Sequence, residues 1–148
     1  MKTLVIGGTG PTGPFVVKGL LEQGHDVAIL NRGSHESPDL PNSVERIIAD
    51  PHFEETLTVA LSGRSFDQII ASYGRLRIIA GLVGEHTDRL ISVGGSPGYR
   101  GIQNPEGVFP EGLQVPLPEI APQIESEKEF RFGFLVKQAE DAVMEGHA

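Results

Sequence analysis

Three glycines stand three residues apart near the start of the chain: Gly7, Gly10 and Gly13. A phosphate group needs backbone N–H donors at the beginning of a helix and a main chain that it can approach closely. Both demands favour residues without side chains. Between the glycines lie two residues whose hydroxyls can donate to phosphate and one that stiffens the turn, namely Thr9, Thr12 and Pro11. The spacing therefore predicts a pyrophosphate-binding turn.

The same glycines could instead form a tight turn between a strand and a helix that binds no ligand. The segments on either side of the glycines help to decide between these two interpretations. A β-branched apolar run, Thr3 to Ile6, precedes them, and a helix that ends near Gly24 is predicted after them. The apolar residues of that helix are Phe15, Val16, Leu20 and Leu21. A second strand is predicted from Asp26 to Asn31, which completes a strand–helix–strand unit. A glycine-rich turn at this place in such a unit is typical of dinucleotide binding.

The end of the second predicted strand bears on the choice of dinucleotide. Sites that prefer NAD usually place a carboxylate there to hold the ribose 2′-hydroxyl, whereas an arginine accommodates the 2′-phosphate of NADP. Asn31 and Arg32 occupy this end, and no carboxylate does. NADP is therefore the expected cofactor and NAD the second choice. The alternative is that Arg32 is an ordinary solvated loop charge.

Composition excludes several classes of protein. The chain has 148 residues, a formal net charge of −8, 39% hydrophobic residues and no cysteine. It can form one core, but it cannot form disulfides or cysteine-bound zinc sites, and its histidines lack the spacing of metal ligands. An acidic protein repels the phosphates of nucleic acids, and no apolar run is long enough to span a membrane. We expect one soluble, cytoplasmic domain over residues 1–148, with neither nucleic acid nor membrane as partner.

Strands and helices alternate along the rest of the first hundred residues. Three more strands are predicted, at residues 44–49, 66–71 and 89–93, with helices at residues 53–61 and 78–83. This alternation is typical of a parallel sheet with helices on both faces. The predicted fold is therefore α/β and Rossmann-like, a doubly wound parallel sheet of five strands in the order 3-2-1-4-5.

Residues 94–125 interrupt this alternation, because they contain six glycines and six prolines and show no sustained periodicity. Irregular loops of this length are uncommon in compact domains and are usually functional or disordered. A last helix is expected after the loop, with Ser126 and Glu129 as its capping box. The apolar stripe of this helix consists of Phe130, Phe134, Leu135, Ala139, Ala142 and Val143.

Further motifs follow the predicted strands: "NRG" at 31–33, "AD" at 49–50 and "SVGGSPGY" at 92–99. Together with the glycine turn they make the chain resemble, over essentially its whole length, the NAD(P)-binding half of extended or atypical short-chain dehydrogenases. The likeness is greatest to the NAD-dependent epimerase/dehydratase group, including its chloroplast stem-loop-binding-protein-like members. The resemblance implies that Asp50 accepts a hydrogen bond from the adenine amino group. An aspartate at this position could equally cap the helix that begins near Phe53.

The resemblance also implies a catalytic tyrosine and lysine on the last helix. Residues 137–140 match the family's K-x-A-E run, so Lys137 would hold the ribose, unless it is an ordinary surface lysine. Four residues earlier the family has the tyrosine that acts as general acid or base, and this chain has Gly133. The two tyrosines of the chain, Tyr73 and Tyr99, lie elsewhere. Tyr99 fits the family's aromatic residue after the fifth strand, and Tyr73 follows the fourth strand, so either could approach the site. Tyr99 is the candidate catalytic tyrosine, although both could be half-buried loop residues.

Ser92 and Ser96 both stand where the family has a serine that orients the substrate, and Ser96 is preferred. The missing tyrosine and the short chain leave two hypotheses. The first is the NADP(H)-binding domain of a truncated epimerase/dehydratase- or reductase-like enzyme acting on an unknown small molecule. The second is a non-catalytic NADP-binding sensor or regulatory module. A homodimer is expected because relatives commonly dimerise through the helices after strands four and five. The stem-loop-binding members suggest RNA binding by analogy, but the acidic net charge of this chain disfavours it.

Overall fold

The structure, a computed structural model, describes residues 1–34, 38–72, 76–104 and 114–146. At its centre is a five-stranded sheet in which neighbouring strands are parallel, in the order β3-β2-β1-β4-β5. The strands are β1 (Lys2–Ile6), β2 (Asp26–Asn31), β3 (Glu45–Ile48), β4 (Gln68–Ser72) and β5 (Leu90–Val93). The predicted α/β class and strand order are confirmed, and every strand lies within two residues of its expected bounds.

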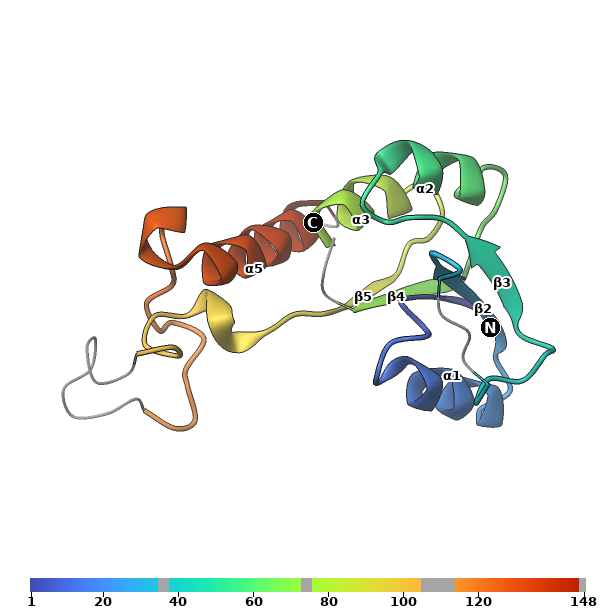
Figure 1. The fold of residues 1–148 in the computed structure, drawn as a ribbon, viewed down its shortest axis with the longest axis horizontal. Helices are drawn as coiled ribbons and strands as arrows, with labels where there is room; N and C mark the ends of the chain where they lie inside the picture. The colour runs from blue at the N-terminus through green and yellow to red at the C-terminus, as the bar shows by residue number, and fades with distance from the viewer. Residues whose placement is uncertain (35–37, 73–75, 105–113, 147–148) are drawn as a thin grey trace.

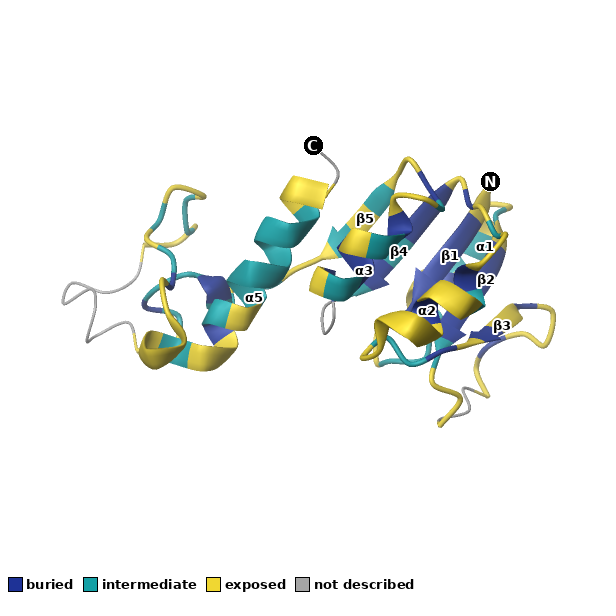
Figure 2. Ribbon diagram, turned by 90° about the horizontal axis from the view of Figure 1, so that it is seen from above, coloured by how far each residue is buried: buried dark blue, intermediate teal, exposed yellow. Residues whose placement is uncertain are grey.

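Helices lie on both faces of the sheet (Figure 1). On one face is α1 (Gly13–Glu22), and on the other are α2 (Glu54–Leu61) and α3 (Leu76–Val83). A short 3-10 helix, η1 (Ser96–Gly98), follows β5, and α5 (Glu127–Gly146) comes last. The last helix packs against α3 and η1 and lies beside the sheet rather than across it (Figure 2).

The register of the strands brings distant parts of the sequence to one edge. Ile6, the last residue of β1, lies in register with Leu30 of β2 and Ala71 of β4. The residues that come next on these three segments are Gly7, Asn31 and Ser72. In open α/β sheets the carboxyl edge of the strands is where ligands bind. The predicted phosphate turn and the predicted ribose-binding end of β2 therefore meet at the expected edge.

Two apolar cores hold the sheet between its helices. Successive residues of a strand point to opposite faces, so Leu4 and Val5 contribute to different cores. The core beneath α1 consists of Val5, Val17, Val27, Ile29, Leu40 and Val44. The larger core beneath α2 and α3 includes Leu4, Leu30, Leu57, Ile69 and Ile79. Burial on both faces explains why the central strands are apolar at nearly every position.

The apolar residues that indicated α1 in the sequence do not all face the core. Phe15 is 78% exposed and Val16 is 37% exposed, whereas Val17 is fully buried. The physical reason is the position of Gly13, at the beginning of the helix, which packs directly against the backbone of Gly8. This contact turns the side of the helix that carries Gly13 and Val17 toward the sheet, because residues four apart share a helix face. Phe15 and Val16 consequently point away from the core.

The beginning of α5 also differs from the predicted capping box. The carboxylate of Glu129 accepts a hydrogen bond from the backbone N–H of Glu125, at 3.2 Å, and not from that of Ser126. Both of its oxygens also accept hydrogen bonds from the guanidinium group of Arg100, at 2.5 and 3.1 Å. This bidentate ion pair joins the long loop, which carries Arg100, to the beginning of α5. The backbone also leaves the helical conformation at Phe130, where φ is −162° and ψ is 100°.

The apolar stripe predicted for α5 is half-buried at most. Ala139 and Val143 pack against the larger core, but Phe134 is only half-buried and Leu135 is 39% exposed. The reason is that α5 packs against α3 and η1 and lies beside the sheet. No helix in the described part of the chain combines the length and hydropathy needed to cross a membrane.

Candidate functional site

A cleft of about 650 Å³ opens at the carboxyl edge of the sheet, next to the glycine turn. Seven residues predicted to bind the cofactor line it, namely Gly7, Thr9, Gly10, Pro11, Thr12, Asn31 and Arg32. The other lining residues are Leu30, Gly33, Ser34, Pro51 and Ser72. The turn after β1, the ends of β2 and β4, and the segment after β3 thus form a single cavity.

The backbone of the glycine turn is bare where it faces the cleft. Gly7 has a φ of +89°, a conformation that favours glycine. A Cβ atom on Gly7 would also lie 2.9 Å from the Oγ of Ser72, a residue that the sequence analysis did not identify. Among the described residues other than its two chain neighbours, a Cβ on Gly10 would meet a single atom within 4 Å, the Gly7 carbonyl oxygen at 3.4 Å. Gly10 therefore leaves open space in the cleft where a ligand can approach the main chain.

Gly13, which was also predicted to bind the cofactor, lies behind the cleft and does not line it. A Cβ on Gly13 would lie 2.3 Å from the carbonyl carbon of Gly8. A Cβ on Gly8 would in turn lie 2.7 Å from Cγ2 of Ile29 in β2. These two glycines allow α1 to pack closely on the turn and the sheet. A role of Gly13 in cofactor binding stays a prediction.

The turn offers backbone hydrogen-bond donors to the cleft. The N–H groups of Gly10 and Gly13 are used inside the turn, where they donate to the carbonyl oxygens of Gly7 and Gly10, both at 3.0 Å. The N–H groups of Thr9 and Thr12 donate to no residue in the described ranges. Thr12 also stands immediately before α1, where the helix dipole favours a negative charge. The donor set therefore suits an anion such as a phosphate.

The end of β2 presents a cation to the cleft. The side-chain oxygen of Asn31 accepts a hydrogen bond from the N–H of Gly33, at 2.8 Å, and this fixes the turn that carries Arg32. Arg32 is exposed and forms no hydrogen bond or ion pair with the residues that the structure describes. Among the described residues, none of those that line the cleft is a carboxylate. Asp50, just outside this lining, is near enough to Arg32 for the two charges to attract each other. Arg32 is thus the one cation among the described lining residues.

Asp50 does not cap α2, so that alternative was wrong. The N-cap residue is Phe53, and no side chain caps the helix there by accepting a hydrogen bond from its first backbone N–H groups. Instead, Oδ1 of Asp50 accepts a hydrogen bond from the backbone N–H of His52 at 3.0 Å and lies 2.7 Å from Nδ1 of the same residue. The N–H of His52 is the main cause that lowers the pKa of Asp50. Asp50 precedes the lining residue Pro51, and its contact with adenine stays a prediction.

The predicted catalytic residues lie around η1 and α5 and outside the cleft lining. Lys137 donates a hydrogen bond from Nζ to Asp141, at 2.5 Å, so its ammonium group is already paired. Ser96 is exposed on η1, and Tyr99 is half-buried just after it. Tyr73 lies outside the described residues. The catalytic roles of Ser96, Tyr99 and Lys137 therefore stay predictions.

Gly133 occupies a position with no room for a side chain. It is the buried residue of α5 that faces η1, and a Cβ there would lie 2.2 Å from the carbonyl oxygen of Pro97. The same Cβ would lie 2.7 Å from Cδ1 of Phe130 and 3.1 Å from Cγ1 of Ile124. The loop after β5 thus fills the space where the resembled family has its tyrosine. Glycine at this position serves packing, and a tyrosine would displace η1.

Comparisons with known proteins give matches of fold. No protein-family model matches the chain, and no curated protein matches it. Among solved structures, the enzyme WbmG of Bordetella bronchiseptica in complex with NAD matches with a TM-score of 0.75 at 17% identity, covering 97% of this chain and 49% of that one. The dTDP-glucose 4,6-dehydratase of Bacillus anthracis in complex with NAD matches with a TM-score of 0.73 at 14% identity, covering 99% and 50%. Vestitone reductase from alfalfa, Medicago sativa, gives 0.67 at 20% identity, covering 97% and 51%.

These similarities establish the Rossmann-like fold expected from the sequence. The chain spans about half the length of the solved structures that it matches. Identity of 14–20% is evidence for shared architecture, and the activities in those names belong to those proteins.

Proposed function

We propose that the chain binds NADP(H) in the cleft between the glycine turn and the ends of β2 and β4. The observation that carries this proposal is the convergence on one cavity of bare backbone at Gly10, the N–H groups of Thr9 and Thr12, which donate to no described residue, and the exposed Arg32. Two solved structures of the same fold hold NAD, which supports a dinucleotide as the ligand.

The residues present fit such a ligand. The turn would hold the pyrophosphate, because Gly10 leaves space for it and the Thr9 and Thr12 N–H groups point to no other acceptor in the described chain. When bound, a nicotinamide supplies or accepts hydride. The chain's own contribution is to orient the dinucleotide along the carboxyl edge of the sheet.

Arg32 is the basis for preferring NADP over NAD. Its guanidinium has no ion-pair partner among the described residues, and none of the described lining residues is a carboxylate that could receive a ribose 2′-hydroxyl. A 2′-phosphate would form the ion pair that Arg32 lacks in this part of the chain. Isothermal titration calorimetry of the chain with NADPH and NADH tests this, and we expect NADPH to bind roughly 10-fold more tightly. Equal affinities would refute the preference, and no binding of either would refute the site.

For the whole protein we propose chemistry of the epimerase/dehydratase or reductase kind on a small molecule. The support is the fold shared with a dehydratase and a reductase. Steady-state assays of NADPH oxidation with a panel of carbonyl compounds test it. The homodimer and the cytoplasmic location also stay predictions. Sedimentation velocity measures the first, and a fluorescent fusion shows the second.

A second candidate function is a non-catalytic NADP-binding module. The observation that favours it is the packing of Gly133 against Pro97, which excludes a tyrosine at the position where the resembled family has its acid or base. The pairing of Lys137 with Asp141 points the same way, because that ammonium is held by a carboxylate. Binding of NADPH without turnover on the carbonyl panel would support the module, and turnover by the unmodified chain would refute it.

A further inference from the structure

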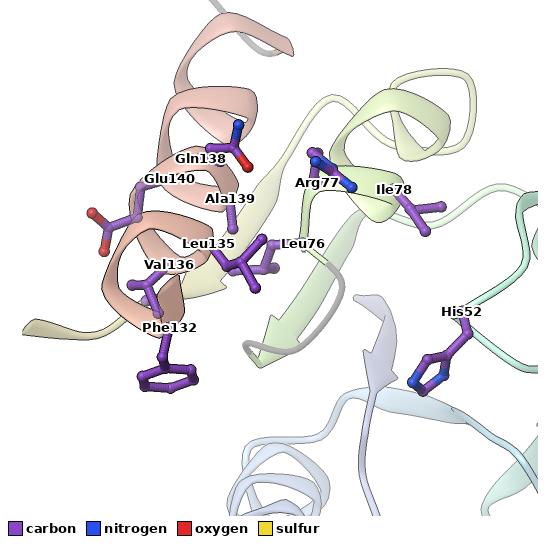
Figure 3. Close-up of a pocket in the computed structure, with 11 residues that line it drawn as sticks. His52, Leu76, Arg77, Ile78, Phe132, Leu135, Val136, Gln138, Ala139 and Glu140 are labelled. Carbon is purple, nitrogen blue, oxygen red and sulfur yellow. The ribbon is translucent and has the colours of Figure 1, made fainter. Parts of the chain in front are cut away.

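A second cavity, of about 440 Å³, lies between α3 and α5. Most of its wall is apolar and consists of Leu76, Ile78, Phe132, Leu135, Val136 and Ala139. Figure 3 shows Leu76 from α3 and Leu135 from α5 projecting into the same space, with His52 at the far end. The volume falls within the range of about 300–1,000 Å³ that is usual for small-molecule sites.

The cavity adjoins the dinucleotide cleft without being part of it. Pro51 lines the cleft, and the next residue, His52, lines the cavity. Ser72 at the end of β4 lines the cleft, and Leu76 at the beginning of the following helix lines the cavity. Both sites therefore lie along the carboxyl edge of the sheet, on segments that follow β3 and β4.

Four polar side chains line the cavity, namely His52, Arg77, Gln138 and Glu140, and they differ in whether they already have a partner among the described residues. The carboxylate of Glu140 accepts a hydrogen bond from the N–H of Gly95 at 3.3 Å, and His52 is held by Asp50. Arg77 is exposed and forms no hydrogen bond or ion pair with any residue in the described ranges. The cavity thus combines an apolar wall with a neutral amide, Gln138, a carboxylate that Gly95 already engages, and one cation, Arg77, that has no hydrogen-bond or ion-pair partner in the described part of the chain.

We propose that this cavity binds a small apolar or aromatic molecule that carries one anionic group. The apolar body would lie against Leu76, Leu135 and Phe132, and the anion would pair with Arg77. Apolar contact supplies affinity, while the one charged pair orients the ligand. The inference does not depend on the identity of the dinucleotide, because the two sites share no lining residue.

Two fluorescent probes of similar aromatic size test this proposal. The anionic probe is 8-anilinonaphthalene-1-sulfonate, and the neutral probe is N-phenyl-1-naphthylamine. We expect each to bind once per chain. The variant Arg77→Gln should weaken the anionic probe about fivefold, as loss of a partly exposed ion pair does, and leave the neutral probe within twofold. Arg131→Gln is the matched control, because Arg131 lies on α5 outside the cavity lining and should leave both probes unchanged.

Removing apolar wall gives an independent readout. Leu135→Asn should weaken both probes about tenfold, while Met144→Asn, on the exposed part of the same helix, should weaken neither. Equal loss of both probes in Arg77→Gln, or several probe molecules per chain, overturns the proposal. So does a dimer through α3 and α5, the two helices through which relatives commonly dimerise, if it excludes the probes and Leu135→Asn dissociates it in sedimentation velocity. The wall is then a subunit interface, so that dimer and this ligand exclude each other. A parallel NADPH titration of each variant keeps this outcome separate from that of the dinucleotide site.

Discussion

Replacing Gly10 with alanine separates cofactor binding from folding. Apart from its chain neighbours, the described residues place a single atom within 4 Å of a Cβ on Gly10, the carbonyl oxygen of Gly7 at 3.4 Å, so this part of the chain has room for it. The same methyl group would stand in the cleft that Gly10 lines and would block the approach of a phosphate to the main chain. Losing one hydrogen bond to a charged group costs about 1.5–3 kcal/mol, which is roughly 10- to 150-fold in Kd. We therefore expect Gly10→Ala to lose most of its affinity for NADPH while its stability stays unchanged.

Gly13→Ala is the matched control, because it adds the same methyl group three residues away. Here the Cβ would lie 2.3 Å from the carbonyl carbon of Gly8 and 2.4 Å from its oxygen, so the backbone must shift. Such overpacking costs about 1–3 kcal/mol, and each kcal/mol lowers the Tm of a domain of this length by about 2–4 °C. Gly13→Ala should therefore unfold at a lower temperature by about 2–12 °C.

The two variants are compared by thermal denaturation followed by circular dichroism and by NADPH titration calorimetry at a temperature where both are folded. The reasoning is refuted if Gly10→Ala binds NADPH as tightly as the unmodified chain. It is equally refuted if Gly10→Ala is destabilised as much as Gly13→Ala, because Gly10 would then serve packing rather than ligand approach.

Three further substitutions test the cofactor preference, the packing of Gly133 and the ion pair at the beginning of α5. Arg32→Ala should weaken NADPH roughly 10-fold and NADH by less than twofold in the same calorimetric titration; equal losses would mean that Arg32 does not contact a 2′-phosphate. Gly133→Tyr should lower the Tm and should not create turnover, because its Cβ would lie 2.2 Å from the Pro97 carbonyl oxygen; a stable, active variant would contradict this packing. The hydrogen bond from Arg100 lowers the pKa of Glu129 in the folded chain. The ion pair therefore stabilises the fold at pH values above the usual carboxyl pKa, and this stabilisation is lost as the pH falls through the lowered pKa of Glu129. In urea unfolding, Glu129→Gln should therefore be less stable than the unmodified chain at pH 7, with the difference shrinking below about pH 4; a difference that does not change with pH would exclude the ion pair as its cause.

The fold and the cofactor end of the site could be predicted because their signals are local. Apolar β-branched runs, glycine stops and the alternation of strands with helices fix a parallel sheet, and the register of a parallel sheet then places the ends of β1, β2 and β4 at one edge. Seven of the predicted cofactor residues consequently line one cleft. Ser72 could have been found by the same logic, since it ends the strand next to β1.

Other features depend on contacts between segments that are distant in the sequence. The exposure of Phe15 follows from the packing of Gly13 on Gly8, which the helical spacing of apolar residues does not reveal. The true partner of Glu129 is Arg100, which lies 29 positions earlier in the sequence. In sequence alone, Gly133 is indistinguishable from a lost tyrosine, and its burial against η1 is what gives it a packing role.

The central claim is that the glycine turn and the end of β2 form a dinucleotide site. Two-dimensional ¹H–¹⁵N correlation spectra of the labelled chain, recorded during titration with NADPH, test it most directly. We expect the backbone amide signals of Thr9, Gly10, Thr12 and Arg32 to shift and to saturate at one NADPH per chain. Shifts confined to other parts of the chain, or no shifts at millimolar NADPH, would contradict it.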